Sequence, residues 1–354
     1  MAGYSGLNLM TKYKRGMQLK PSGNFDDKDW MAYADLQNNI NRKYYKEDFE
    51  PFIHWENYKE TVLNDLQLLK NDQANHFLIY KDGIAAGFYA RRLMGSDVNF
   101  VFDFLVDNVT DDFIKIIFED LHTFLLTNCK DFAYSNASDM RISASLVKSG
   151  AEEIDKMIYS RLLKSEINET ELRDFVNCFS LANGLRLKFN DNVSEDIFDR
   201  YYEIYNEARI AMNEFNPHRK EVSKRTKENL RVKLKYDKGD EDKMYMYILF
   251  DGDEIAAFSS LYVRKENPKM IDHGGGLTAV SPKYRGNKYA KFLKSKLYLR
   301  IIEDYDDFDF IRTDTYPWNK YMFNINQEMG FKPYKEYSEF RISKINILEN
   351  LKLL

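Results

Sequence analysis

The residues with the clearest chemical potential form a basic turn, Lys283–Lys288, in the last third of the chain. The turn follows a short apolar run that ends at Val280 and precedes a stretch whose apolar residues have helical spacing. The first amides of a helix have no partner within the helix, and the helix dipole favours an anion there. Gly286 lets the backbone approach a ligand, and Arg285 and Lys288 add positive charge. Such a turn suits phosphate binding, although the same residues without a supporting context would favour a solvated surface turn.

The elements that must position this turn follow from the periodicity of the second half of the chain. Helices are expected at Glu169–Ala182, Glu195–Asn213, Lys224–Leu234 and Lys320–Met329, besides the helix after the turn. Strands are expected at Leu185–Phe189, Met244–Phe250, Ile255–Val263, Ile271–Val280, Phe308–Thr313 and Tyr337–Ile342. Three consecutive glycines, Gly274–Gly276, interrupt the strand that leads to the turn.

The first half of the chain shows a similar order of elements. Helices are expected at Asp26–Asn38, Trp55–Lys70, Asp111–Leu126 and Ser138–Lys148. Strands are expected at His76–Tyr80, Ile84–Leu93, Val98–Val106, Phe132–Tyr134 and Met157–Leu163.

Two segments of the first half recur in the second half in the same order. Tyr80–Phe88 is similar to Phe250–Phe258, and the series Asn136, Met140, Gly150 is similar to the series Asn319, Met322, Gly330. Because two separate segments match in the same order, chance similarity is a poor explanation, and the pattern indicates duplication of one α/β domain. We therefore predict two domains, at residues 1–164 and 165–354.

The two copies differ at the corner where the phosphate turn stands. The first copy has Asp107–Asp112 there, with three carboxylates and no glycine, lysine or arginine. Aspartate at a helix start caps the helix well, but it would repel a pyrophosphate. The ligand site is therefore expected in the second copy alone, with the first copy as a degenerate partner.

The composition limits the possible classes of protein. The 354 residues are 44% hydrophobic and 31% charged, with a net charge of −4, so the whole chain does not attract nucleic acid. The two cysteines, Cys129 and Cys178, lie far apart and away from histidines at ligand spacing, which argues against a disulfide framework or a metal site. No apolar run is long enough for a signal peptide or a membrane span, so a soluble, cytoplasmic protein is expected.

Residues 245–340 resemble the GCN5-related N-acetyltransferases, and the duplicated chain resembles their tandem-domain members, such as mycothiol synthase. In that family an R/Q-x-x-G-x-G/A turn starts the helix after the fourth strand, and Arg285–Ala290 matches it, with Lys288 in place of the middle glycine. Tandem members also share a pattern near the C-terminus. This chain matches it with Thr313, Thr315 in place of an asparagine, Asn319, Met322, Asn326, Gly330 and Phe331.

The resemblance implies an α+β fold of two tandem domains, each a mixed, largely antiparallel twisted sheet flanked by helices in α/β/α layers. It implies acetyl-CoA as the acyl donor and direct transfer of the acetyl group to an amine of a small molecule or peptide. The pantetheine arm would pair with Thr278, Ala279 and Val280, and Asn319 would reach its amides. The pyrophosphate would lie on the turn formed by Arg285, Gly286, Asn287, Lys288, Tyr289 and Ala290.

The catalytic groups are less clear, because many members of the family use a tyrosine acid where this chain has Asn326. His273 could act as a base, with Asp272 beside it, although a histidine at a strand entry is often a surface residue. Tyr316, just after the fifth strand, could protonate the leaving thiolate, or it could be a structural aromatic residue. Three residues of the region that shapes the acceptor pocket in the family could hold a cationic substrate: Glu207, Glu214 and His218.

Two other functions are compatible with these features. The missing tyrosine and the degenerate first copy would suit a non-catalytic protein that binds coenzyme A or regulates a partner. An aminoacyl transferase using an aminoacyl-tRNA donor is a third possibility, against which the net acidity and the phosphate turn count. The sequence identifies neither the acceptor nor the oligomeric state, for which a monomer and a homodimer are both open.

Overall fold

A computed structural model describes residues 16–44, 53–68, 74–94, 97–106, 109–214, 224–238, 242–265 and 267–353. The chain divides into two compact units. Unit 1 comprises residues 1–155 together with 337–354, and unit 2 comprises residues 156–336. No helix among the described residues is both long and apolar enough to cross a membrane.

Unit 1 contains a mixed sheet in the order β1-β2-β3-β4-β5-β13, in which only β4 and β5 are parallel. The strands are β1 (Met17–Pro21), β2 (Ala74–Lys81), β3 (Ile84–Met94), β4 (Asp97–Phe104), β5 (Phe132–Ala137) and β13 (Lys332–Ser343). The helices are α1 (Asp27–Tyr44), α2 (Trp55–Leu68), α3 (Asp111–Thr127), α4 (Met140–Lys148) and α10 (Lys344–Leu353).

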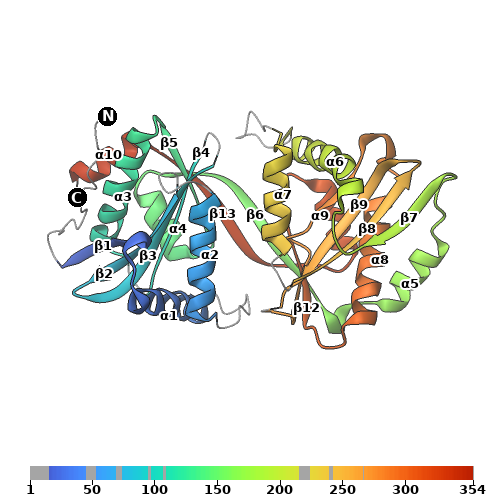
Figure 1. Ribbon diagram of the computed structural model, residues 1–354, viewed down its shortest axis with the longest axis horizontal. Helices are drawn as coiled ribbons and strands as arrows, with labels where there is room; N and C mark the ends of the chain where they lie inside the picture. The colour runs from blue at the N-terminus through green and yellow to red at the C-terminus, as the bar shows by residue number, and fades with distance from the viewer. Residues whose placement is uncertain are drawn as a thin grey trace. The chain divides into compact units, whose positions relative to one another are not determined.

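The two faces of this sheet carry separate apolar clusters. Phe100, Phe113 and Leu121 belong to the larger one, which includes side chains of α3, α4 and α10. Trp30 and Tyr33 of α1 pack with Leu78 on the other face. Figure 1 shows α10, at the end of the chain, beside α3, and Ile347 of α10 is completely buried. The last helix of the chain is therefore part of the core of unit 1.

Unit 2 contains a mixed sheet in the order β6-β12-β10-β9-β8-β7, with only β10 and β12 parallel, and β11 pairs with β9 alone. The strands are β6 (Glu152–Leu163), β7 (Leu185–Asn190), β8 (Lys243–Asp251), β9 (Glu254–Val263), β10 (Met270–Asp272), β11 (Thr278–Val280) and β12 (Phe310–Thr315). The helices are α5 (Glu169–Cys178), α6 (Glu195–Glu214), α7 (Lys227–Lys238), α8 (Tyr289–Asp304) and α9 (Lys320–Glu328).

Helices cover both faces of this second sheet. Phe198 and Tyr201 of α6 pack with Phe258 of β9 in one cluster. Leu297 and Tyr298 of α8 belong to a cluster on the other face. Figure 1 shows α5 beside α8. These layers confirm the predicted α+β class with mixed, largely antiparallel sheets.

Two long strands each begin in one unit and end in the other. β6 pairs with β12 from Ile158 to Leu163, although it follows the elements of unit 1 in sequence. β13 pairs with β5 through Ser338–Ser343, although it follows the elements of unit 2. The compact units therefore differ from the division at 1–164 and 165–354, because the apolar pattern of a strand does not specify which sheet it joins.

The duplication is visible in matching irregularities. The β2–β3 hairpin has a register shift between Ile79 and Tyr80, and the β8–β9 hairpin has one between Leu249 and Phe250. Helices α4 and α9 are followed by Gly150 and Gly330, with φ of 78° and 89°. The predicted match of Asn136 to Asn319 is wrong in register, since Asn136 lies in β5 and Asn319 caps α9.

The position of Asn319 in the repeat belongs instead to Asp139, whose side chain caps α4. Helix caps recur because each helix start leaves amides unpaired, and either Asp or Asn satisfies one of them.

Most predicted elements are confirmed, with three differences. Strand β1 and helix α10 were not expected. The expected strand Ile271–Val280 is two strands, β10 and β11, joined by the three glycines. A Cβ atom on Gly276 would lie 1.9 Å from the carbonyl oxygen of Ser260, so no other residue allows this close approach to β9.

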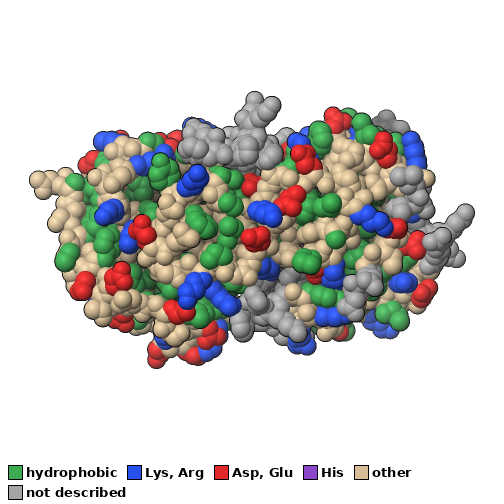
Figure 2. Space-filling view, turned by 180° about the vertical axis from the view of Figure 1, so that it is seen from behind, with side chains coloured by type: hydrophobic (Ala, Val, Ile, Leu, Met, Phe, Trp, Pro, Cys, Tyr) green, Lys and Arg blue, Asp and Glu red, His purple; other side chains and the backbone are tan. Residues whose placement is uncertain are grey.

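The distribution of charged groups can be followed on one face of the molecule. Figure 2 shows acidic and basic side chains interspersed over the described part of the face that it draws. This distribution agrees with the small net charge of −4. Attraction of an anion must therefore come from local groups rather than from a field of the whole protein.

Candidate functional site

The sheet of unit 2 opens between β10 and β12. The two strands pair over only three positions, from Met270 opposite Phe310 to Asp272 opposite Arg312. Beyond that last pair, β12 continues to Thr315 beside β6, whereas β11 continues beside β9. The parallel strands therefore diverge after Asp272 and Arg312.

The edge of β11 that faces away from β9 has no paired strand among the described residues. Leu277 O accepts from Ser260 N at 3.0 Å, and Ser281 N donates to Ala256 O at 3.0 Å. Because backbone groups alternate in direction along a strand, the peptide groups of Thr278 and Val280 point to the unpaired side. An extended ligand with amide groups could pair with this edge as an added strand does.

The turn after β11 exposes a helix start. Gly286 and Lys288 have left-handed backbone conformations, with φ of 82° and 60°, and α8 begins at Tyr289. No side chain caps this start, so the first amides of α8 have no side-chain partner. A Cβ on Gly286 would meet no atom within 4 Å, which leaves open space above the turn. The left-handed Lys288 costs on the order of 1 kcal/mol, a strain typical of functional turns.

Arg285, Asn287 and Tyr289 have different roles in this turn. Arg285 is exposed, and its Nε donates to the carbonyl oxygen of Val280 at 3.2 Å. Asn287 donates to the carbonyl oxygens of Tyr284 at 3.0 Å and of Arg285 at 3.3 Å, which holds the turn. Tyr289 is buried against Phe179, so only its backbone can face a ligand.

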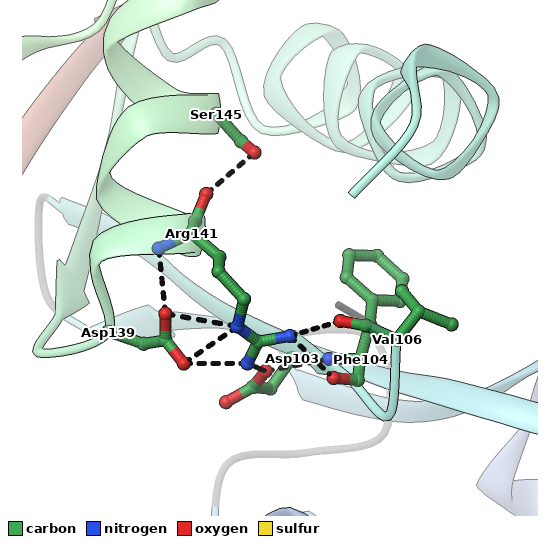
Figure 3. Close-up of polar contacts among 6 residues, drawn as sticks. All are labelled: Asp103, Phe104, Val106, Asp139, Arg141 and Ser145. Atoms are coloured by element: carbon green, nitrogen blue, oxygen red, sulfur yellow. Dashed lines mark hydrogen bonds and ion pairs between the residues drawn. The ribbon is translucent and has the colours of Figure 1, made fainter. Parts of the chain in front are cut away.

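Unit 1 fills the corresponding place with its own side chain (Figure 3). β4 and β5 also separate after a last parallel pair, Phe100 opposite Ser135. Arg141 reaches β4 from the start of α4, where its Nη1 donates to the carbonyl oxygens of Phe104, at 3.1 Å, and of Val106. Its Nη2 pairs with Asp139 at 2.6 Å and with Asp103 at 3.2 Å.

The first turn of α3 in unit 1 is also acidic, with Asp111 and Asp112. Asp111 pairs with Lys148 at 2.5 Å. Asp107 and Asn108 of the predicted acidic corner lie outside the described residues. Among the described residues of this place in unit 1, Arg141 occupies the edge of β4 at Phe104, and the start of α3 carries aspartates instead of basic residues.

His273 and Asp272 are buried rather than exposed. The hydroxyl of Tyr298 bonds to Nδ1 of His273 at 2.8 Å, and Nε2 lies 3.1 Å from Oγ1 of Thr278 and 3.2 Å from Oγ of Ser259. Burial, with a smaller effect of the Lys294 charge, holds the pKa of His273 well below its usual value. The imidazole is therefore neutral and fixes Thr278 at the free edge of β11.

The carboxylate of Asp272 is ion-paired with two neighbouring arginines. Its carboxylate lies 3.3 Å from Arg312 and 3.2 Å from Arg264, and it accepts from the amide of Gly275 at 2.9 Å. Burial opposes the charge, but the attraction of Arg312 and Arg264 outweighs it and holds the pKa of Asp272 below its usual value. A carboxylate held in this way orders the glycine segment and is poorly suited to accept a further proton.

Sequence reasoning missed two ionisable residues next to this network, the buried Lys294 and the half-buried Asp314. Burial lowers the pKa of Lys294 on α8 to about 7, against the opposing attraction of Asp314. Burial and the charge of Asp272 raise the pKa of Asp314 on β12 to about 6, against the opposing effects of Arg312 and Lys294. The signal in the sequence was the position of Lys294 on the apolar side of α8, one turn from Tyr298.

The residues after β12 are also placed by the structure. Tyr316 stacks on Trp318 with ring centroids 4.8 Å apart. Oδ1 of Asn319 accepts from the amide of Met322 at 3.4 Å, which is a cap interaction. Asn326 is buried, its Nδ2 donates to Thr315 Oγ1 at 3.0 Å, and its Oδ1 has no partner among the described residues.

A cavity of about 620 Å³ lies between α6 and the basic turn that contains Arg285. Its lining includes three carboxylates, Glu203, Glu207 and Glu254, together with Ser281 and Arg285. Glu203 lies 3.8 Å from Lys224, also on the lining. The side chain of Glu214 and the whole of His218 lie outside the described part of the chain. The cavity thus lies between the basic turn and a face of α6 that carries both signs of charge, because Arg200 also lines it.

Comparison with known proteins gives a likeness in structure without a match in sequence. No family model and no curated protein matches the chain. A solved structure described as a tandem GNAT protein from the clavulanic acid biosynthesis pathway has a TM-score of 0.70 and 12% identity, covering 93% of this chain and 98% of that chain.

Two further structures support the same likeness. A GCN5-related N-acetyltransferase from Sphaerobacter thermophilus has a TM-score of 0.65 and 10% identity, covering 94% of this chain and 96% of that chain. A probable N-acyltransferase from Enterococcus faecalis has a TM-score of 0.52 and 8% identity, covering 92% of this chain and 72% of that chain. At such identities the likeness concerns the fold alone.

Proposed function

The chain has the fold of tandem GCN5-related N-acetyltransferases, and from this premise we propose that it transfers the acetyl group of acetyl-CoA to an amine, with the cofactor site in unit 2. The pyrophosphate binds at the start of α8, on the amides and charges of Arg285–Lys288. The pantetheine arm pairs with the free edge of β11 at Thr278–Val280.

The contrast between the two units carries this proposal. In unit 2 the strands diverge beside an edge without a paired strand, whose Val280 carbonyl accepts from Arg285 of the turn itself, and beside an uncapped, basic helix start. In unit 1 the same place holds Arg141 and an acidic helix start. A repeated fold that keeps one such place open and fills the other is expected when only one copy binds the ligand.

The chemistry is direct attack of the acceptor nitrogen on the thioester carbon. The backbone N–H groups on the free side of β11 are placed to stabilise the charge that develops on the carbonyl oxygen. His273 acts through Thr278 as a positioning residue, since its ring is buried and bonded on both nitrogens. Asp272 positions the glycine segment through Gly275.

The acceptor enters by the cavity beside α6. Its lining carries three carboxylates and three cations, so it suits a polar acceptor, an amine of a small molecule or peptide. Tyr316, the first residue after β12, is proposed to contact the reacting end, and Asn319, the cap of α9, is proposed to contact the pantetheine amides.

A second function has one observation in its favour. Asn326 stands where the resembling family has its tyrosine acid, and its amide is engaged by Thr315. An amide cannot donate a proton to a thiolate at neutral pH. A protein that binds coenzyme A without turnover is therefore the alternative.

Calorimetric titration of the full chain with acetyl-CoA, followed by a thiol-release assay over a panel of small amines and peptides, tests the proposal. We expect one acetyl-CoA bound per chain and thiol release that depends on the amine. Binding with no turnover on any amine would favour the alternative, and absence of binding would exclude both functions.

A further inference from the structure

Lys294 lies where β10 and β12 of unit 2 separate. Its charge acts on His273, the first residue after the last paired residue of β10. Its charge also acts on Asp314, the second residue after Arg312, which is the last residue of β12 paired with β10. The side chain of Lys294 is 1% exposed. It is therefore enclosed between α8 and the diverging ends of both strands.

No hydrogen bond is made by the Lys294 ammonium among the described residues. Its Nζ lies 5.6 Å from the centre of the Phe331 ring and 5.9 Å from the centre of the Tyr298 ring. The titratable groups that face it are Asp314 from β12, His273 after β10 and Tyr298 on its own helix. A buried ammonium without hydrogen bonds costs several kcal/mol, so such a group is retained where a ligand completes its bonding.

The free edge of β11 leads to the same point. His273 contacts Thr278, the first residue of that edge, through Nε2. A ligand chain that runs from the turn at Arg285–Lys288 along β11 toward Thr278 therefore ends beside His273 and Lys294. For acetyl-CoA, that end is the thioester.

We propose that Lys294 protonates the sulfur of coenzyme A when the thioester breaks. This inference rests on the proposed function and supplies the acid that Asn326 cannot be. The electron pair of the broken C–S bond goes to sulfur, and a proton moves from Lys294 Nζ to that sulfur, giving the free thiol. The acceptor nitrogen loses one N–H proton when the amide forms, and that proton restores the Lys294 ammonium.

The electrostatics of the site suit this role. Burial brings the pKa of Lys294 down to about 7, and Asp314 limits the fall. An acid with a pKa near the working pH is both protonated often enough and acidic enough to donate. Tyr298 is a weaker candidate, because burial raises its pKa well above the usual value.

The test compares three ligands that differ only at sulfur: coenzyme A, desulfo-coenzyme A, which lacks the sulfur, and acetyl-CoA. Binding to the full chain is measured by calorimetry near neutral pH. We expect the wild type to bind coenzyme A about tenfold or more tightly than desulfo-coenzyme A, the scale of one hydrogen bond between charged groups. Lys294→Met should abolish that preference and leave acetyl-CoA affinity unchanged, which also shows that the variant is folded.

Lys296→Met is the matched control, since Lys296 lies on the same helix but contacts the Tyr247 ring instead. It should keep the wild-type preference for coenzyme A. Equal affinities of the wild type for coenzyme A and desulfo-coenzyme A, or an undiminished preference in Lys294→Met, would overturn the inference while the proposed function stands. A wild type that binds none of the three ligands would overturn both.

Discussion

Arg141 and Tyr321 each lie two residues after the side chain that caps a helix, Asp139 in α4 and Asn319 in α9. The Arg141 guanidinium is anchored to the carbonyls at the end of β4, whereas Tyr321 is 81% exposed. The side chain at this position of the repeated fold therefore fills the space between β4 and β5 in unit 1. In unit 2 it leaves the space between β10 and β12 open.

This contrast predicts one cofactor site per chain. Arg285→Gln should weaken acetyl-CoA binding by roughly tenfold, because one charge and one donor near the pyrophosphate are lost. Arg141→Gln should destabilise unit 1 but leave the affinity unchanged. Calorimetry on both full-length variants measures affinity and stoichiometry, and a loss of binding in Arg141→Gln would contradict the assignment.

Gly286→Glu should abolish acetyl-CoA binding while the fold persists. The turn has φ of 82° and open space above it, so a side chain fits at the cost of roughly 1–2 kcal/mol of backbone strain, but its carboxylate opposes the phosphates. The matched control is Gly252→Glu, in the β8–β9 hairpin, where φ is 58° and the space is also open. A Gly286→Glu variant that binds like the wild type would show that the turn is not the phosphate site.

Asn319→Asp separates a cap from a ligand contact. Asp caps a helix as well as Asn, so the melting temperature should not change. If the Asn319 amide donates to the ligand, Asp removes that donor and costs about 1–3 kcal/mol of acetyl-CoA binding. Unchanged affinity in a variant with unchanged melting temperature would mean that Asn319 serves only as a cap. Asn319→Ala, which should lose about 1 kcal/mol of stability, is the control for the cap.

Lys294→Met should stabilise unit 2, and the gain should depend on pH. The pKa of Lys294 falls to about 7 on folding from an ordinary 10.5, so the unfolded chain binds more protons between these values and wild-type stability rises with pH there. The penalty for the buried charge is therefore complete below pH 7 and absent above about 10.5.

We expect Lys294→Met to gain about 1–4 kcal/mol near neutral pH, the range seen when buried charges are replaced by apolar groups. Urea unfolding at neutral pH and above pH 9 measures the difference. A gain that is the same at both pH values would show that Lys294 is not a buried, shifted amine.

Removal of residues 337–354 should unfold unit 1 rather than unit 2. The segment supplies the strand that pairs with β5 and the buried side chains of Phe340, Ile342 and Ile347. Hydrogen exchange on the truncated chain should show loss of protection in β4 and β5 and retention in β8 and β9. Protection that persists in β5 would mean that unit 1 does not depend on the end of the chain.

The sequence alone determined most of the elements and the candidate turn, but not β1 or α10. The apolar periods of α3 and α8 and the hairpin at Asp82–Gly83 are local, so short stretches of the chain specify them. The basic residues and Gly286 likewise lie within a few positions of one another, and a turn followed by a helix brings their amides and charges together.

Only the tertiary structure decided which sheet β6 and β13 join, because pairing partners distant in sequence leave no local pattern. It also decided that His273 and Asp272 are buried and bonded to Tyr298 and Arg312, respectively. It likewise brought Lys294 of α8 within the electrostatic influence of Asp314 of β12. Burial and neighbouring charges set the proton affinity of a side chain, and both depend on which elements pack around it.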